Sequence, residues 1–227
     1  MLSDILKWGG KRQDGPQGPV AAGTSRGAAA SPEEPVVGSK AFPKFLSVLT
    51  ANTSPAPVLV DFGPVIGTNV EFFGERLGCK LFIEDLIGDL GRHTKAGTLD
   101  AFPTALETRF RHADASVDGI LCWDLFDFLD KKSADALARQ VIRMVRPGGV
   151  VMGLFCTSAK PESSPFTKYE IVDEGNFRHK QHGGAGGMKR AIQNRDIIRM
   201  FEGLTVSDSF LLKSNIREML LRRLQTP

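Results

Sequence analysis

Ten consecutive residues, Val58 to Gly67, constrain the fold of this 227-residue chain more than any other segment. An apolar run ends in Asp61, and a turn containing Gly63 follows before a predicted helix begins at Thr68. Continuous apolar runs are typical of strands buried on both faces of a parallel sheet. A strand, a glycine turn and a helix place an acid and unpaired helix N–H groups around one crevice, where nucleotide-like ligands bind.

Predicted strands and helices alternate along the rest of the chain. Apolar runs predict strands at 58–62, 80–84, 117–123, 150–156, 205–212 and 216–224, and apolar stripes predict helices at 42–49, 68–77, 99–110, 133–144 and 194–201. Repeated β-α-β crossovers predict an α/β, doubly wound, mostly parallel sheet with helices on both faces. Only Lys213-Ser214-Asn215 separates the last two strands, which therefore form an antiparallel C-terminal hairpin.

Three segments fit the alternating pattern poorly. Residues 1–39 are rich in Gly, Ala, Pro and Ser and are predicted to be a disordered N-terminal tail, so that the folded domain covers 40–227. Residues 86–114 should hold a third strand, but 99–110 has a helical pattern, so that strand is predicted to be missing or very short. Residues 160–190 are an insertion and a candidate substrate lid, with a strand at 169–172 and a polar, glycine-rich loop at 179–187.

The ends of the helix at 133–144 are predicted from single residues. Ser133 is a typical N-cap residue, and Pro147-Gly148-Gly149 predicts the tight turn that ends the helix before the next strand.

Composition excludes several classes of function. A formal net charge of +3 without a basic run argues against a nucleic-acid partner. No apolar stretch reaches the roughly 18 residues needed to span a bilayer. The cysteines Cys79, Cys122 and Cys156 lie in or beside apolar runs without C-x-x-C spacing. They predict reduced thiols in a cytoplasmic protein, with neither disulfides nor a metal site.

Four segments in this order resemble the class I (Rossmann-like) S-adenosylmethionine-dependent methyltransferases. They are the acid-x-Gly-x-x-x-Gly turn at 61–67, the acidic strand end Leu81-Phe82-Ile83-Glu84-Asp85-Leu86, the run from Ala113 to Asp124, and Arg143-Met144-Val145-Arg146-Pro147-Gly148-Gly149-Val150-Val151. The resemblance covers roughly residues 57–224, and the terminal hairpin matches the family's antiparallel seventh strand.

The resemblance implies S-adenosyl-L-methionine as the cofactor and assigns it a set of contacts. These are Asp61, Gly63, Pro64, Gly67, Glu84, Asp85, Trp123 and Asp124. Gly63 would let the backbone approach the ligand, and Asp61 would accept hydrogen bonds from the ligand's ammonium. Asp85 is expected to accept the ribose hydroxyls, with Glu84 as the alternative because a one-residue strand shift exchanges them. Trp123 and Asp124 would face the methionine part or the reacting methyl.

The implied function is methyl transfer to a small-molecule or protein acceptor. Methyl transfer from a sulfonium is an in-line displacement, which depends more on alignment of the reacting groups than on a dedicated catalytic residue. If a catalytic residue is present, the candidates are Asp124 and His182. The family's middle glycine is replaced by Val65, which favours an alternative: a catalytically degenerate binding or regulatory module of the same fold. A nicotinamide-dependent oxidoreductase is disfavoured because no G-x-G-x-x-G turn follows the first strand.

Overall fold

The computed structural model describes residues 34–51, 56–158 and 163–225, apart from the side chains of 182–185. Its elements are β1 (Val36–Gly38), α1 (Phe42–Ala51), β2 (Val58–Asp61), α2 (Gly67–Val70), η1 (Glu71–Arg76), β3 (Lys80–Ile83), α3 (Leu86–Ala96), η2 (Leu99–Ala101), α4 (Phe102–Arg109), β4 (Val117–Trp123), η3 (Leu125–Phe128), α5 (Lys131–Met144), β5 (Val145–Cys156), β6 (Ser163–Asp173), β7 (Asn176–Met188), α6 (Asn194–Met200), β8 (Thr205–Leu211) and β9 (Ile216–Arg222). Within the described ranges, no helix has the length and apolar character required to cross a membrane.

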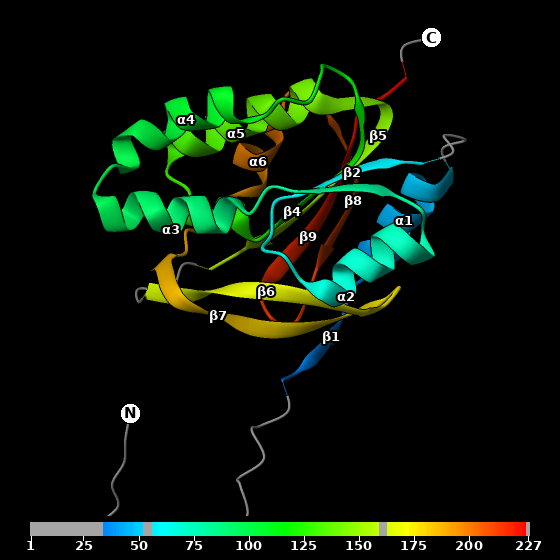
Figure 1. Cartoon of the computed structure of the whole chain (residues 1–227), viewed down its shortest axis with the longest axis horizontal. Coiled ribbons are helices and arrows are strands. Elements are labelled where there is room, and N and C mark those ends of the chain that lie inside the picture. Colours follow the sequence, from blue (N-terminus) through cyan, green and yellow to red (C-terminus); the bar gives the residue numbers. More distant parts are fainter. Residues whose placement is uncertain (1–33, 52–55, 159–162, 226–227) are drawn as a thin grey trace, which may run out of the picture. The chain divides into compact units, whose positions relative to one another are not determined.

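The main sheet has six strands in the order β3-β2-β4-β5-β9-β8 (Figure 1). Neighbouring strands from β3 to β5 run parallel, whereas β9 is antiparallel to both β5 and β8. Asn215, in the turn between β8 and β9, has φ of +59°. The predicted fold class is therefore confirmed, including the antiparallel terminal hairpin.

The third strand is absent from the fully described segment between β3 and β4. Helix α3 occupies the place where a strand was considered, and η2 and α4 continue the helical path. Leu86, Ile87 and Leu90 of α3 are buried against the sheet, whose edge strand is thus β3. Gly97, with φ of +67°, ends α3. The sequence analysis did not predict α3 as a helix.

Helices cover both faces of the main sheet, as a doubly wound fold requires. One apolar core contains buried residues of α3, α4, α5 and α6, and a second contains those of α1 and η1 (Figure 1). The second core also includes Tyr169 and Ile171 of β6 and Phe177 of β7.

A second sheet with the strand order β1-β7-β6 lies beside the second core. Strands β6 and β7 are antiparallel, with Tyr169 opposite His179, so the prediction of a loop at 179–187 is wrong. Backbone pairing with β6 runs to Met188 and stabilises this polar, glycine-rich segment, whereas β1 pairs only with residues 176–178; the side-chain pattern did not reveal the strand. Strand β1 also differs from the predicted tail, since residues 36–38 pair with β7; residues 1–33 lie outside the described residues.

Two local predictions around α5 are wrong. Asp130, not Ser133, is the N-cap: its carboxylate accepts a hydrogen bond from the Ser133 N–H at 2.9 Å. The Pro-Gly-Gly segment does not follow the helix as a separate turn, because α5 ends at Met144 and β5 begins at once. Gly148 has φ of +81° within the first part of that irregular strand.

Candidate functional site

The strand order reverses between β2 and β4, and the turn after β2 lies at this point. Strand β3 follows β2 along the chain on one side, while β4 pairs with its other side. Ligands of open α/β sheets bind in the crevice beyond the carboxyl ends of such strands. The crevice found here, called the Asp61 crevice, is lined by Asp61, Phe62, Gly63, Pro64, Ile66, Asn69, Ile87, Cys122, Trp123, Asp124, Leu125, Thr167 and Tyr169.

Asp61 is a buried carboxylate, with 2% of its surface exposed. Its Oδ1 accepts hydrogen bonds from the Gly63 N–H at 2.8 Å and from Trp123 Nε1 at 2.6 Å. Burial raises the pKa of Asp61 to about 6, against the lowering effect of these two donors. A carboxylate held this deep needs donors, and the protein supplies them from β4 and from the glycine turn.

Trp123 ends β4 in the left-handed region, with φ of +48°. Its indole stacks on Tyr169 with the rings 3° from parallel and their centroids 5.0 Å apart. Gly63 also lies close to the indole: a Cβ added there would lie 3.0 Å from the indole Cδ1 and Nε1 atoms. The close approach that Gly63 permits is therefore made to the protein's own tryptophan.

The remaining residues of the glycine turn point in different directions. Pro64 lines the Asp61 crevice, whereas Val65 is 67% exposed and has no positive φ. A Cβ added to Gly67 would meet nothing within 4 Å. The departure at Val65 thus lies in solvent and takes no space from the crevice.

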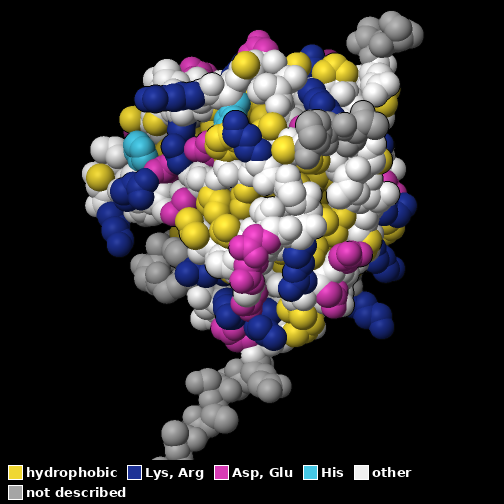
Figure 2. All heavy atoms as spheres, turned by 45° about the vertical axis from the view of Figure 1, so that its right-hand side comes forward, with side chains coloured by type: hydrophobic (Ala, Val, Ile, Leu, Met, Phe, Trp, Pro, Cys, Tyr) yellow, Lys and Arg dark blue, Asp and Glu magenta, His cyan; other side chains and the backbone are white. Residues whose placement is uncertain are grey.

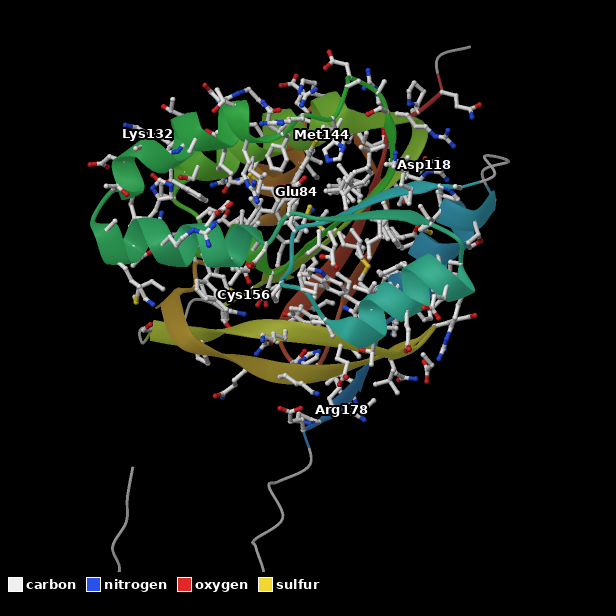
Figure 3. The ribbon with its side chains drawn as sticks, viewed as in Figure 1. Glu84, Asp118, Lys132, Met144, Cys156 and Arg178 are labelled. Carbon is white, nitrogen blue, oxygen red and sulfur yellow. The ribbon has the colours of Figure 1, made fainter. Side chains whose placement is uncertain are left out.

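The two acids after β3 are held by neighbouring structure and do not line the crevice. Asp85 caps α3 by accepting a hydrogen bond from the Gly88 N–H at 3.1 Å, with its own φ at +36°. Glu84, labelled in Figure 3, lies 3.2 Å from His112 Nε2 and 3.4 Å from Arg109. Asp85 is nevertheless close enough for its charge to contribute to the raised pKa of Asp61. The ribose role of either acid stays a prediction.

Three charged groups lie beside the crevice at the ends of β4 and β7. Lys189 donates to Asp124 at 2.6 Å, and this ion pair is almost completely buried. Both carboxylate oxygens of Asp127 accept the N–H of Cys156 (labelled in Figure 3), at 3.1 and 3.0 Å. Burial, and then the charge of Asp124, raises the pKa of Asp127 to about 7. Asp124 is therefore an ion-pair partner in this arrangement, and its catalytic role stays a prediction.

Strand β6 forms one wall of the crevice and is fixed to α2 by a buried amide. Asn69 Nδ2 donates to the Tyr169 carbonyl at 2.9 Å, and Asn69 Oδ1 accepts the Ile171 N–H at 2.8 Å. Thr68 Oγ1 adds a longer contact of 3.3 Å to Glu170. The insertion is thus attached to the helix that follows the glycine turn.

The histidines of the insertion lie on β7. His179 packs edge-on against Tyr169, with ring centroids 5.0 Å apart, and burial lowers its pKa. His182 lies on the same strand, and its side chain is outside the described residues.

Asn69, Tyr169 and Lys189 were missed by the sequence analysis, although all three contact predicted residues or β6. Tyr169 is the chain's single tyrosine and lay in a candidate strand, which was the available signal. Nothing in the sequence marked Asn69 or Lys189 as a site residue, because only the tertiary fold brings β6 and the end of β7 to the crevice.

The arrangement leaves little room for a nucleoside-sized ligand. Small-molecule sites measure roughly 300–1,000 Å³, whereas the free volume of the Asp61 crevice is about 10 Å³, enough for roughly one water molecule. With the Trp123 indole in its present position, the free volume of the Asp61 crevice is too small for S-adenosylmethionine. The crevice would hold that ligand only after the side chains that line it had moved.

The sequence matches no protein-family model and no curated protein. The structure is similar to the 1,6-didemethyltoxoflavin-N1-methyltransferase of Burkholderia thailandensis, with bound S-adenosylhomocysteine, at 14% identity over 82% of this chain and 79% of that one (TM-score 0.48). It is also similar to the CcbJ methyltransferase of Streptomyces caelestis at 12% identity, over 80% and 94% of the two chains (TM-score 0.46). A third is the glycopeptide N-methyltransferase MtfA complexed with S-adenosyl-L-methionine, at 15% identity over 82% and 94% (TM-score 0.42).

The order and directions of the strands are the observations that bear on the family resemblance. A parallel run β3-β2-β4-β5 extended by an antiparallel terminal hairpin matches the pattern expected from the sequence, with one strand missing. In its fold, this chain therefore resembles the class I S-adenosylmethionine-dependent methyltransferases without their third strand.

Proposed function

We propose that this protein binds S-adenosylmethionine at the Asp61 crevice and transfers its methyl group to a small-molecule or protein acceptor in the cytoplasm. One observation carries the proposal: the buried Asp61 carboxylate lies at the switch point of the sheet, and only one of its two oxygens accepts a hydrogen bond from the described residues. Both hydrogen bonds to this carboxylate, from the Gly63 N–H and from Trp123 Nε1, end on Oδ1. Its Oδ2 remains to accept a charge-assisted hydrogen bond from the ammonium of an amino-acid ligand.

The chain's residues would bind and orient the ligand more than react with it. When bound, the cofactor would supply an electrophilic methyl group on its sulfonium; the acceptor's nucleophile would take the methyl as the C–S bond breaks, with S-adenosylhomocysteine as the leaving group. Asp61 would hold the ammonium, Gly63 would permit close approach, and Asp85 or Glu84 would accept the ribose hydroxyls. Strand β6 would exclude water from the reacting atoms.

A second candidate is a binding or regulatory module of the same fold without catalysis. The observation that favours it is the indole of Trp123, which fills the space between Gly63 and Tyr169. Such a module would bind S-adenosylhomocysteine without transferring methyl groups, or would not bind it.

Calorimetry on the full chain separates these candidates. We expect S-adenosylmethionine and S-adenosylhomocysteine to bind and NAD not to bind. Methyl release from labelled S-adenosylmethionine is then measured on panels of metabolites and proteins. Binding without methyl release supports the module, and absence of binding by both sulfur ligands contradicts the proposed cofactor.

Matched variants assign the binding to the crevice. Asp61→Asn keeps an acceptor for Gly63 and Trp123 but removes the charge, so we expect S-adenosylhomocysteine to bind at least tenfold more weakly. Val65→Ala changes an exposed side chain of the same turn and should bind as the wild type does. Equal affinities for all three proteins would place the ligand elsewhere.

The ribose assignment needs its own pair of variants. Asp85→Asn retains a good N-cap for α3 while removing the charge, and Glu84→Gln removes the charge beside Arg109 and His112. We expect Asp85→Asn to weaken S-adenosylhomocysteine binding more than Glu84→Gln does. The reverse order assigns the ribose to Glu84, and no effect of either rejects both.

A further inference from the structure

The indole of Trp123 lines the Asp61 crevice and has contacts of four kinds there. Its N–H donates to Asp61, one ring face lies parallel to Tyr169, and Phe177 packs edge-on at 5.3 Å. The backbone of Gly63 lies close to the Cδ1–Nε1 edge of the ring. Only 5% of the residue is exposed. The ring thus has the environment of a bound aromatic ligand: a stacking partner, a hydrogen-bond acceptor and a glycine that permits close approach.

The backbone of Trp123 adds a second, independent observation. A bulky residue with positive φ is an outlier, and such conformations cost of order 1–3 kcal/mol unless the surroundings maintain them. Trp123 has φ of +48° at the end of β4. The contacts of the indole with Asp61, Gly63 and its aromatic neighbours help to maintain this conformation, so the present position of the side chain depends on them.

From these contacts we infer that Trp123 is an intramolecular occupant of the Asp61 crevice, and that ligands enter by displacing its indole from Asp61 and Gly63. This inference rests on the proposed function for the identity of the ligand. Trp123 then determines access to the site, in contrast to the cofactor-contact role expected from the sequence. On binding, a donor of the ligand replaces the indole N–H as the hydrogen-bond partner of the Asp61 carboxylate. The ligand also takes the place of the indole beside the backbone of Gly63.

The strands of the insertion determine how easily the indole can leave. Tyr169 is on β6 and Phe177 on β7, and Asn69 fixes β6 to α2 through two backbone groups. Displacement of the indole therefore breaks one stacked contact, one edge contact and the hydrogen bond to Asp61. The apparent affinity for a ligand equals its intrinsic affinity multiplied by the fraction of molecules in which the crevice is vacant.

The test compares S-adenosylhomocysteine binding by full-length wild type, Trp123→Ala and Trp123→Phe. We expect at least tenfold tighter binding by Trp123→Ala, because the ligand no longer competes with the indole. Trp123→Phe keeps a ring but loses the N–H, so its affinity should lie between the other two. Phe201→Ala, which removes a buried ring packed on Phe126 outside the crevice, controls for general loosening and should bind like the wild type.

Fluorescence provides a measurement that does not depend on the alanine variant folding. The chain has two tryptophans, so Trp8→Phe leaves Trp123 as the single reporter. We expect S-adenosylhomocysteine to increase quenching of Trp123 emission by acrylamide, since the indole becomes exposed on displacement.

The outcomes separate the two proposals. Wild-type binding with unchanged quenching, or with equal or weaker binding by Trp123→Ala, overturns the displacement of Trp123 and leaves the proposed function standing. Absence of binding by the wild type and by both Trp123 variants overturns the proposed function and the displacement with it.

Discussion

At the scale of single residues, the burial of Asp61 and Asp127 has consequences for stability. Both carboxyls have raised pKa values, about 6 and about 7, chiefly because burial disfavours the charged form. Each carboxyl has an ordinary pKa in the unfolded state and a higher pKa in the folded state. At a pH between these two values, the folded state binds more protons than the unfolded state does. The free energy of unfolding therefore falls as pH rises through that window.

Asp61→Asn should consequently stabilise the protein at pH 8. The window for Asp61 runs from its ordinary value of 3.8 to about 6, and a shift of that size corresponds to about 3 kcal/mol. We expect the variant's gain in unfolding free energy to approach this value at pH 8 and to be small at pH 4.5, as measured by urea titration. Asp135→Asn, a half-buried control that pairs with Lys131 on the surface of α5, should show little change at either pH; a gain for Asp61→Asn that is independent of pH would contradict the assignment.

Gly63→Ala should destabilise the protein by about 1–3 kcal/mol, because the added Cβ would overpack the indole at 3.0 Å and Asp61 Oδ1 at 3.1 Å. Most of that loss should disappear in the Trp123→Ala background, where the indole is gone. Gly67→Ala is the control, since its Cβ meets open space at the start of α2. Additive losses in the Gly63 and Trp123 double mutant would show that the two residues are not in contact.

At the scale of elements, the hairpin of β6 and β7 packs on the main domain through the second apolar core and is also held by the Asn69 hydrogen bonds from α2. Asn69→Ala would leave the Tyr169 carbonyl and the Ile171 N–H without their buried partner. We expect a loss of about 3 kcal/mol in unfolding free energy, with faster hydrogen exchange at the Ile171 amide. Thr68→Ala removes only a long, partly buried hydrogen bond of 3.3 Å and should lose less than about 1 kcal/mol. Equal losses for the two variants would argue against the anchoring role.

The elements also show which patterns predict structure. Strand β4 and helix α5 were predicted close to their observed limits because each buries a continuous run or a clear stripe. Helix α3 was missed because its exposed face is polar and two glycines interrupt its apolar positions. Strand β7 was missed because its polar, glycine-rich part is stabilised by backbone pairing with β6, which the side-chain pattern of one strand does not record.

At the scale of the whole molecule, charged side chains lie on the described surface and the three thiols lie in the interior. Lys and Arg side chains are interspersed with Asp and Glu on the face in Figure 2. The three cysteines are free and buried. Burial raises the pKa of the Cys79 and Cys156 thiols to about 11, and raises that of Cys122 further.

The native protein should therefore react slowly with a thiol reagent at pH 8, because thiolate is the reactive form. We expect all three cysteines to become reactive together across the urea unfolding transition, as followed by absorbance of the released reagent. Rapid labelling of one cysteine in the native protein, located by mass spectrometry, would show local opening at that site instead.

The sequence by itself determined the alternation of strands and helices, the acid and glycine turn after β2, and the terminal hairpin. Each depends on local apolar patterns and on turn residues close to one another in the chain. Only the tertiary structure decided where the strand order reverses and which side chains meet in the Asp61 crevice. Trp123, Gly63 and Tyr169 come from distant segments, and their contact depends on the packing of β6 against the end of β4. Apolar periodicity records which face a side chain occupies but not which neighbour it contacts, so Trp123, expected to contact a cofactor, instead donates to Asp61 and stacks on Tyr169.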